Sequence, residues 1–413
     1  MTAPAVAAAV ADAHRREWAF VLAATVRVTR DLDLAEECVQ DAYARALSTW
    51  DSSGIPRNVG AWLTTAARNR ALDLLRRKQT ARRALPLLIA EAEIDTADSA
   101  TQVDIPDDRL RLIFTCCHPA LAQPAQVALT LRLLCGLTTD EVARAFLVTT
   151  PTMAARITRA KKKIAQARIP YRVPPADELP ARIDAVADVV HLLFTTGHTA
   201  PTGEVLVRAD LVERSLDLAR MLHALLPDDA TVAALLSLIL FGSARMAARV
   251  DADGRLVPLP EQDRGRWDKQ AIEDGNSLAR KAFRAQPTRR YPLLAAIAAV
   301  HVRAPGRDAT NWREIIALYD LLMRAWPSPV VALNRAVAIG EADGATAGLC
   351  ALDELAADPR LAGYHYLPMA RAEMLWRLGR FDEARLAYQE AALLTENSVE
   401  REFIAAKLDR FTE

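Results

Sequence analysis

The spacing of apolar and polar positions predicts helices along almost the whole chain. Between residues 33 and 53 the apolar positions follow the period of a helix with one buried face, at Ala35, Cys38, Val39, Ala42, Tyr43, Ala46, Leu47 and Trp50. Glycine is scarce, with 15 residues in 413, and alanine, the best helix former, is abundant. No apolar run approaches the ~20 residues that span a bilayer. We therefore expect an all-α fold.

A first helical module is expected within residues 1–90. Asp33 begins a capping box with Glu36 three residues later, and the polar face of the helix that follows carries Glu36, Glu37, Gln40 and Asp41. After a break at 51–56, a second helix is predicted from about Val59 to Lys78. Its polar face carries mostly bases and amides, at Arg68, Asn69, Arg70, Arg76, Arg77 and Lys78. Trp62 fits either the core or a platform for base stacking, and the core is favoured.

A second module, over residues 109–172, contains a helix-turn-helix pattern. Thr138 and Glu141 form a full capping box, residues 147–149 make the turn, and Thr150 caps the next helix with Pro151 in its first position. That helix has an apolar stripe at Met153, Ile157, Ala160 and Ile164, and an exposed face with Thr152, Ala155, Arg156, Arg159 and Lys163. Such a helix can enter a major groove, with Lys161, Lys162 and Lys163 on phosphates. The alternative is a plain helical hairpin with a basic tail.

Charge is uneven along the chain although it sums to zero. Residues 1–172 hold 24 bases and 18 acids, a net of +6, and the remainder holds 28 bases and 34 acids, a net of −6. Two stretches, Arg68–Arg83 and Arg156–Arg172, each contain seven bases, while Glu91–Asp108 contains seven acids and no base. This grouping indicates two polyanion-binding modules joined by an acidic linker over 91–108. Solvated helix faces are the alternative for each cluster.

The two modules together resemble regions 2 and 4 of extracytoplasmic-function (ECF) sigma factors of the sigma-70 family. The resemblance covers about residues 10–170 and depends on the segments 35–43, 61–77 and 137–164. It implies that Glu36, Glu37, Gln40 and Asp41 dock on core RNA polymerase. It also implies that the helix from Arg68 to Lys78 reads the −10 promoter element, and that the helix from Thr152 to Lys163 reads the −35 element. Leu147 stands where many members have glycine.

The last 240 residues read as further helices. Pro170–Pro180 marks a boundary, and helices are expected at Ile183–Phe194, Glu204–Leu226 and Thr231–Ala248, followed by a turn at Asp253-Gly254. We expect a helical extension over 173–284 and repeats over 285–413. The segment 370–391 resembles a tetratricopeptide repeat (TPR), with small residues at Ala372, Gly379 and Ala384 for close helix packing. Stacked helix pairs suit a regulatory protein partner. The whole extension resembles that of one ECF subgroup, which implies a role in regulation or in an added contact with polymerase.

Other chemistry is weakly represented. Cys116, Cys117 and His118 lack the spacing of a zinc site, so buried small residues are the favoured interpretation, and no phosphate loop or catalytic motif occurs. Five cysteines without scaffold spacing favour a reducing cytoplasm. We therefore expect a cytoplasmic sigma factor that is not an enzyme, needs no cofactor or metal, and does not bind membranes. The alternatives are a stand-alone helix-turn-helix regulator with a TPR-like sensor, and a repeat scaffold, which leaves the basic clusters unexplained.

Overall fold

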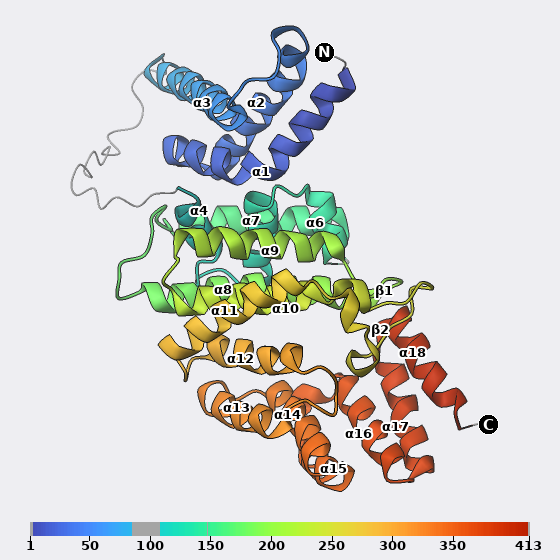
Figure 1. Ribbon diagram of the computed structural model, residues 1–413. Coiled ribbons are helices and arrows are strands. Elements are labelled where there is room, and N and C mark those ends of the chain that lie inside the picture. The colour runs from blue at the N-terminus through green and yellow to red at the C-terminus, as the bar shows by residue number, and fades with distance from the viewer. Residues whose placement is uncertain (1–2, 85–107, 147, 412–413) are drawn as a thin grey trace. The chain divides into compact units, whose positions relative to one another are not determined.

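The computed structural model describes residues 3–84, 108–146 and 148–411, and it is helical almost throughout (Figure 1). The described residues contain two strands of two residues each. The chain divides into two compact units, residues 1–189 and 190–413. The all-α prediction is confirmed, whereas the finer five-part division stays a prediction.

The N-terminal unit begins with three long helices that pack on one another. They are α1 (Ala3–Thr29), α2 (Leu32–Ser53) and α3 (Val59–Ala84). The apolar stripe predicted for α2 is largely buried, with Cys38, Val39, Ala46 and Trp50 fully enclosed, while Leu47 is exposed. The predicted cap of α2 is wrong by two residues. Asp31 is the N-cap, and its carboxylate accepts hydrogen bonds from the Asp33 and Leu34 amides, so the expected Asp33–Glu36 box does not form.

Shorter helices complete this unit. They are α4 (Asp108–Cys116), α5 (Gln123–Leu129) with a π-helical turn at Thr130–Leu134, α6 (Thr139–Ala145), α7 (Thr150–Gln166), and the start of α8 (Leu179–His198). The capping box of α6 is confirmed, because the Thr138 amide donates to the Glu141 carboxylate and the Glu141 amide donates to Thr138. Helix α7 starts one residue earlier than predicted: Thr149 is its N-cap, and its hydroxyl accepts from the Thr152 amide. The departure at Leu147 lies outside the described residues.

The C-terminal unit starts with helices packed around one apolar helix. They are α9 (Ala209–Leu225), α10 (Ala230–Ala244), α11 (Lys269–Ala285) and α12 (Arg290–Arg303). The predicted helix at Glu204 begins at Ala209, and Thr231–Ala248 ends as a separate 3-10 turn at Met246–Ala248. The Asp253-Gly254 turn is confirmed, with a bridge between Val250 and Leu256. Among the described helices, one segment, Ala230–Ala248, is apolar and long enough to span a membrane, but 67% of its most apolar window is buried inside the protein. It is therefore a core helix.

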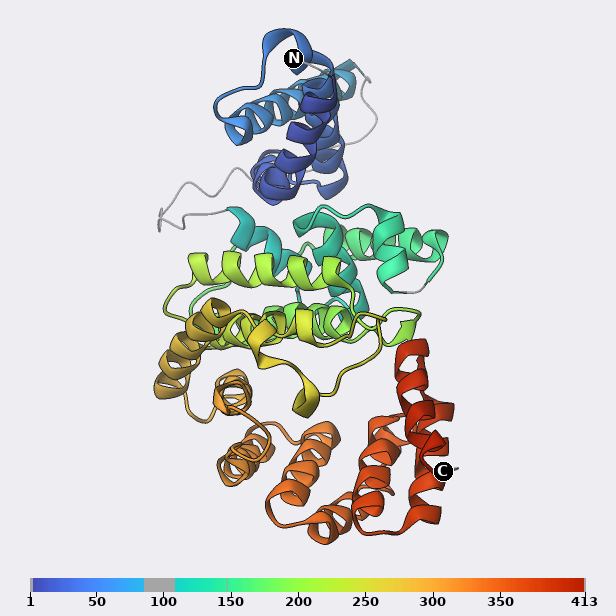
Figure 2. The ribbon, with the colours of Figure 1, turned by 45° about the vertical axis from the view of Figure 1, so that its right-hand side comes forward.

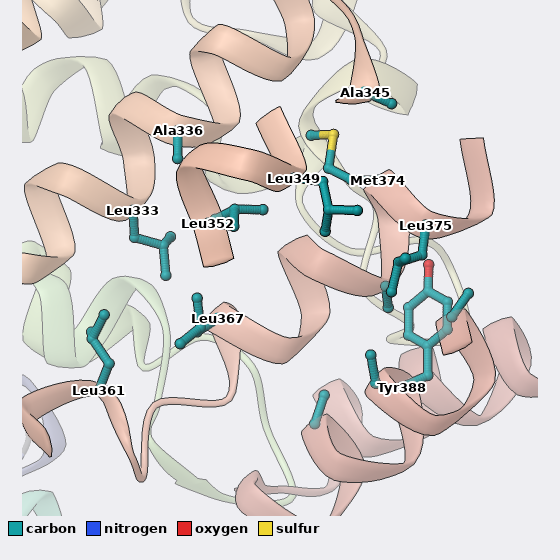
Figure 3. Close-up of a cluster of buried hydrophobic side chains, with 14 of the residues drawn as sticks. Leu333, Ala336, Ala345, Leu349, Leu352, Leu361, Leu367, Met374, Leu375 and Tyr388 are labelled. Carbon is teal, nitrogen blue, oxygen red and sulfur yellow. The ribbon is translucent and has the colours of Figure 1, made fainter. Parts of the chain in front are cut away.

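Antiparallel helix hairpins follow, in which each helix packs against the next, as Figures 1 and 2 show. They are formed by α13 (Trp312–Ala325), α14 (Pro329–Ala342), α15 (Ala345–Asp353), α16 (Tyr366–Arg377), α17 (Phe381–Leu394) and α18 (Ser398–Asp409). The core shared by α14 to α18 is drawn in Figure 3 and includes Leu333, Leu349, Leu352, Met374, Leu375 and Tyr388.

Small residues have two different roles in these repeats. Gly379 was expected to permit close helix packing, and this is wrong. It has a φ of +72° in the turn between α16 and α17, and apart from its two chain neighbours no residue has an atom within 4 Å of where its Cβ would be. The close crossing lies instead between α14 and α15. A Cβ on Gly348 would lie 2.6 Å from the Cα of Gly340, so a side chain there would force the helices apart.

The end of the chain returns to the beginning of the C-terminal unit. Strand β1 (Thr202–Gly203) pairs in parallel with β2 (Glu396–Asn397), next to each other in Figure 1. The buried Asn397 amide donates to the carbonyls of Ala200 and Val205 at 2.9 and 3.0 Å. These bonds join segments nearly 200 residues apart, so the repeats and the preceding helices form one folded unit.

Candidate polymerase and promoter interfaces

Three of the four residues predicted to dock on polymerase lie on the surface of α2. Glu37, Gln40 and Asp41 are exposed. Asp41 also contacts α3, where Arg70 Nε lies 2.7 Å from its Oδ2, with both side chains partly open to solvent. An exposed pair of this kind contributes little to stability. The acidic face of α2 is thus available to a partner, as the sequence suggested, at these three positions.

Glu36 does not belong to that face, so its prediction as an exposed residue is wrong. Its side chain is 7% exposed and forms ion pairs with Arg132, at 2.8 Å, and with Lys161. Arg132 is in the π-helical turn and Lys161 is on α7, so the pairs join α2 to the second half of the unit. Glu36 is buried because it lies on α2 between Ala35 and Cys38, which are both fully buried. A carboxylate in such a position needs cations inside the protein to compensate its charge.

The prediction that Lys161 contacts a DNA phosphate is also wrong. Its ammonium, 11% exposed, contacts Glu36 and lies 2.6 Å from Asp33. Burial lowers the pKa of Lys161, but the two carboxylates more than offset this and hold the pKa above its usual value. A lysine so placed is occupied within the protein and is not presented to a phosphate. Lys162 and Lys163, the next two residues, are exposed.

The basic face of α3 is open. Arg68, Asn69, Arg76 and Arg77 are exposed and Arg70 is partly exposed, whereas the Lys78 side chain lies outside the described residues. Trp62 is partly buried and meets the enclosed Trp50 edge to face, with ring centroids 5.3 Å apart. This packing accords with the core interpretation of Trp62 and leaves part of its ring in solvent.

The predicted stripe of α7 is confirmed, because Met153, Ile157, Ala160 and Ile164 are all buried. On the other side, Thr152, Ala155 and Arg159 are exposed. The Arg156 guanidinium lies 6.0 Å from the centre of the Phe146 ring, and Arg156 is only partly exposed. Helices α6 and α7 therefore form a helix-turn-helix with a polar, basic outer face.

Sequence reasoning missed the residues that join the two halves of this unit. Trp18 of α1 donates from its indole N–H to the Leu133 carbonyl at 3.1 Å, and Tyr171 donates to the Ala23 carbonyl at 2.9 Å. Arg132 was also missed. It is the lone charge in the apolar run 125–137, and a charge in such a run indicates a buried ion pair.

The cysteine pair predicted to be buried is buried. Cys116 and Cys117 are enclosed at the C-terminal end of α4, and burial raises the pKa of the Cys117 thiol to about 12. A thiol with that pKa stays protonated at neutral pH, which is unfavourable for a metal ligand. The neighbouring His118 ring accepts a hydrogen bond from the Ala120 amide.

Comparison with known proteins places both interfaces in one family. Residues 14–81 match the model for Sigma-70 region 2, residues 111–164 match Sigma-70 region 4, and residues 182–283 match a family of unknown function, DUF6596. An uncharacterised protein of Rhizobium meliloti is 41% identical over 94% of this chain and 92% of its own length. The probable ECF RNA polymerase sigma factor SigI of Mycobacterium tuberculosis is 28% identical over 40% of this chain and 58% of its own length.

Region 2 followed by region 4 on one chain defines a sigma-70 type transcription initiation factor. The chain belongs to the ECF group of this family and has a C-terminal helical extension that includes the DUF6596 segment. Its partners are core RNA polymerase and promoter DNA. Yeast Tom70, a solved structure, aligns over 94% of this chain and 81% of its own with a TM-score of 0.38 and 11% identity, a likeness too low to support an argument.

Proposed function

We propose that this sigma factor divides its contacts among three helices. The exposed acids of α2 bind core polymerase, the basic face of α3 contacts the −10 element, and the N-terminal half of α7 reads the −35 element. The observation that carries the proposal is the separation of charge on the surface: Glu37 and Asp41 are exposed on α2, while α3 and α7 expose bases. A stand-alone regulator would need the basic faces but not the acidic one.

Charge reversal on α2 tests the polymerase contact. The double variant Glu37→Lys/Asp41→Lys should bind core polymerase at least ten-fold more weakly, with an unchanged helical circular-dichroism signal. The matched control, Glu390→Lys/Glu402→Lys, makes the same change in net charge at exposed positions of α17 and α18 and should bind normally. Equal affinity of the two double variants would favour the stand-alone regulator.

A substitution on α7 tests the reading of DNA. Arg156→Ala should cost about 1–3 kcal/mol on promoter DNA and relax sequence preference near −35, as expected for a base contact. Lys163→Ala should instead weaken promoter and random DNA alike and lower the salt slope by about one unit. If Arg156→Ala weakens both DNAs equally, Arg156 does not read a base.

The proposal extends to the C-terminal repeats and to the location of the protein. We infer that the C-terminal repeats bind a regulatory protein, because stacked helix pairs offer an extended surface of this kind. We also infer a cytoplasmic protein that acts by binding alone, without catalysis or membrane contact, in keeping with its four buried cysteines and one exposed cysteine, none of which forms a disulfide bond.

A further inference from the structure

One face of α11, in the DUF6596 segment, gathers bases around a hollow. The hollow has a volume of about 590 Å³ and is lined by Ser277, Arg280, Lys281, Arg284 and Ala285. These positions repeat every three or four residues, so they share one side of the helix. The opposite side is buried, with Gly275, Ala279 and Ala282 enclosed. We call the four polar residues of this lining, Ser277, Arg280, Lys281 and Arg284, the α11 basic face.

The positive charge of this face is little compensated. Among the described residues, no carboxylate lies within 4 Å of Arg280 or Arg284, and the carboxylate near Lys281 is that of the highly exposed Asp228, at 3.2 Å. The Lys281 ammonium also donates to the Pro227 carbonyl, at 3.1 Å. Burial lowers the pKa of nearby His223, and Lys281 lowers it further. In the sequence, residues 275–307 contain seven bases and no acid, although the chain beyond residue 172 is acidic overall.

The composition of the lining favours a nucleic acid over a protein. Protein interfaces depend on buried anchors, among which Trp, Tyr and Arg are enriched, but this lining has no aromatic residue and its one apolar residue is Ala285, so its arginines have no apolar surroundings to bury them. Arginine, lysine and serine side chains are the usual partners of DNA phosphates. The lining residues lie along the side of the C-terminal half of α11 and not at the N-terminal end, which recognition helices use to contact base edges. We therefore expect contact with the DNA backbone, independent of sequence.

We propose that the α11 basic face is a third DNA-binding surface, which holds the phosphate backbone of promoter DNA outside the −10 and −35 elements. This proposal rests on the proposed function, which brings the protein to a promoter. It assigns to the DUF6596 segment an electrostatic contact that adds affinity without adding sequence specificity.

The test uses the variant Arg280→Gln/Lys281→Gln/Arg284→Gln in the full chain with core polymerase. Affinity is measured on promoter fragments that keep both elements while the flanking DNA on either side is shortened. The wild type should bind long fragments more tightly than short ones, and the variant should lose that gain. The slope of log affinity against log salt on long fragments should fall by about 1 to 3 units, roughly one per lost phosphate contact.

The matched control is Arg371→Gln/Arg380→Gln/Arg385→Gln, which removes three bases from α16, α17 and the turn between them. If this control loses as much affinity as the first variant, net charge alone explains the effect and the proposed surface is wrong. An unchanged dependence on flanking DNA in the first variant would also overturn it. Urea midpoints of both variants show whether folding is preserved.

A second experiment tests the DNA-binding surface independently of the proposed sigma function. The free full chain is titrated with a duplex of random sequence at low salt, and the α11 variant should bind several-fold more weakly than the control. If the wild type fails to support promoter-specific transcription while this difference persists, the proposed function is wrong and the DNA surface stands. If transcription is normal and the difference is absent, the surface is wrong and the sigma function stands.

Discussion

Two clusters of positive charge, one in each unit, are held in different ways. In the N-terminal unit, the cations Arg132 and Lys161 are paired with the carboxylate of Glu36. In the C-terminal unit, Arg249 donates to the His198 carbonyl and Arg264 to the His301 carbonyl. Both carbonyls lie in the last turns of helices, where the helix dipole favours cations. Within the described residues, no carboxylate lies within 4 Å of Arg245, Arg249 or Arg264.

This difference determines what each interior tolerates. A buried carboxylate with two cations is a coupled set, and the loss of the carboxylate removes the partner of Arg132 and one of the two partners of Lys161, which leaves buried charge poorly compensated. The arginines of the second unit instead raise the local positive potential. Burial lowers the pKa of His198 to about 2 and that of His301 to about 4, with Arg245 contributing at both. The first interior should therefore be sensitive to one substitution, and the second to acid.

The largest expected effect is that of Glu36→Ala. It removes the carboxylate that pairs with Arg132 and one of the two carboxylates that hold Lys161, which keeps only the exposed Asp33, and breaking a buried ion pair in this way costs about 3–5 kcal/mol. Urea unfolding of the full chain measures the loss. Glu37→Ala, the exposed neighbour, is the control and should change stability by less than about 0.5 kcal/mol. Similar small values for both variants would mean that Glu36 is not enclosed.

Lys161 and Lys163 lie on the same helix, α7, and their substitution should affect the free energy of unfolding differently, by smaller amounts than Glu36→Ala. Lys161→Ala removes one partner of Glu36 but leaves Arg132, so we expect a loss of about 1–3 kcal/mol in folding stability. Lys163→Ala should leave stability within about 0.5 kcal/mol of the wild type. Urea midpoints of the two variants provide the comparison, and a reversed order would contradict the assignment of Lys161 to the interior.

These two lysines also show which features of the structure could be predicted from the sequence and which could not. Helical period, caps and the order of the two regions predicted the fold class, the helix-turn-helix and most exposed positions, because they depend on neighbours along the chain. The sequence could not show that Glu36 and Lys161, 125 residues apart, meet inside the unit. Both lie near the edge of an apolar stripe, where a rotation of a few tens of degrees decides between solvent and core. The spacing of Gly340 and Gly348 is likewise a tertiary property.

Acid should weaken the second unit through its neutral histidines. The folded pKa values of His198 and His301 lie below the usual value of about 6.5, so the unfolded chain binds protons first and stability falls as pH drops below 6.5. Between pH 6.5 and 5 each histidine should cost roughly 1.5 kcal/mol. Urea unfolding at both pH values measures this, and His198→Gln should reduce the dependence by about half. An unaltered pH dependence in His198→Gln would contradict the buried, neutral state of this histidine.

Promoter-specific initiation by the full chain tests the whole account most directly. Purified core polymerase is combined with the protein and a set of promoter fragments selected from a random library for run-off transcription. We predict discrete transcripts from fragments that share two spaced elements, present with the wild type and strongly reduced with Glu37→Lys/Asp41→Lys. Binding of the protein to the same DNA without any transcript from core polymerase would contradict the account and identify a stand-alone regulator.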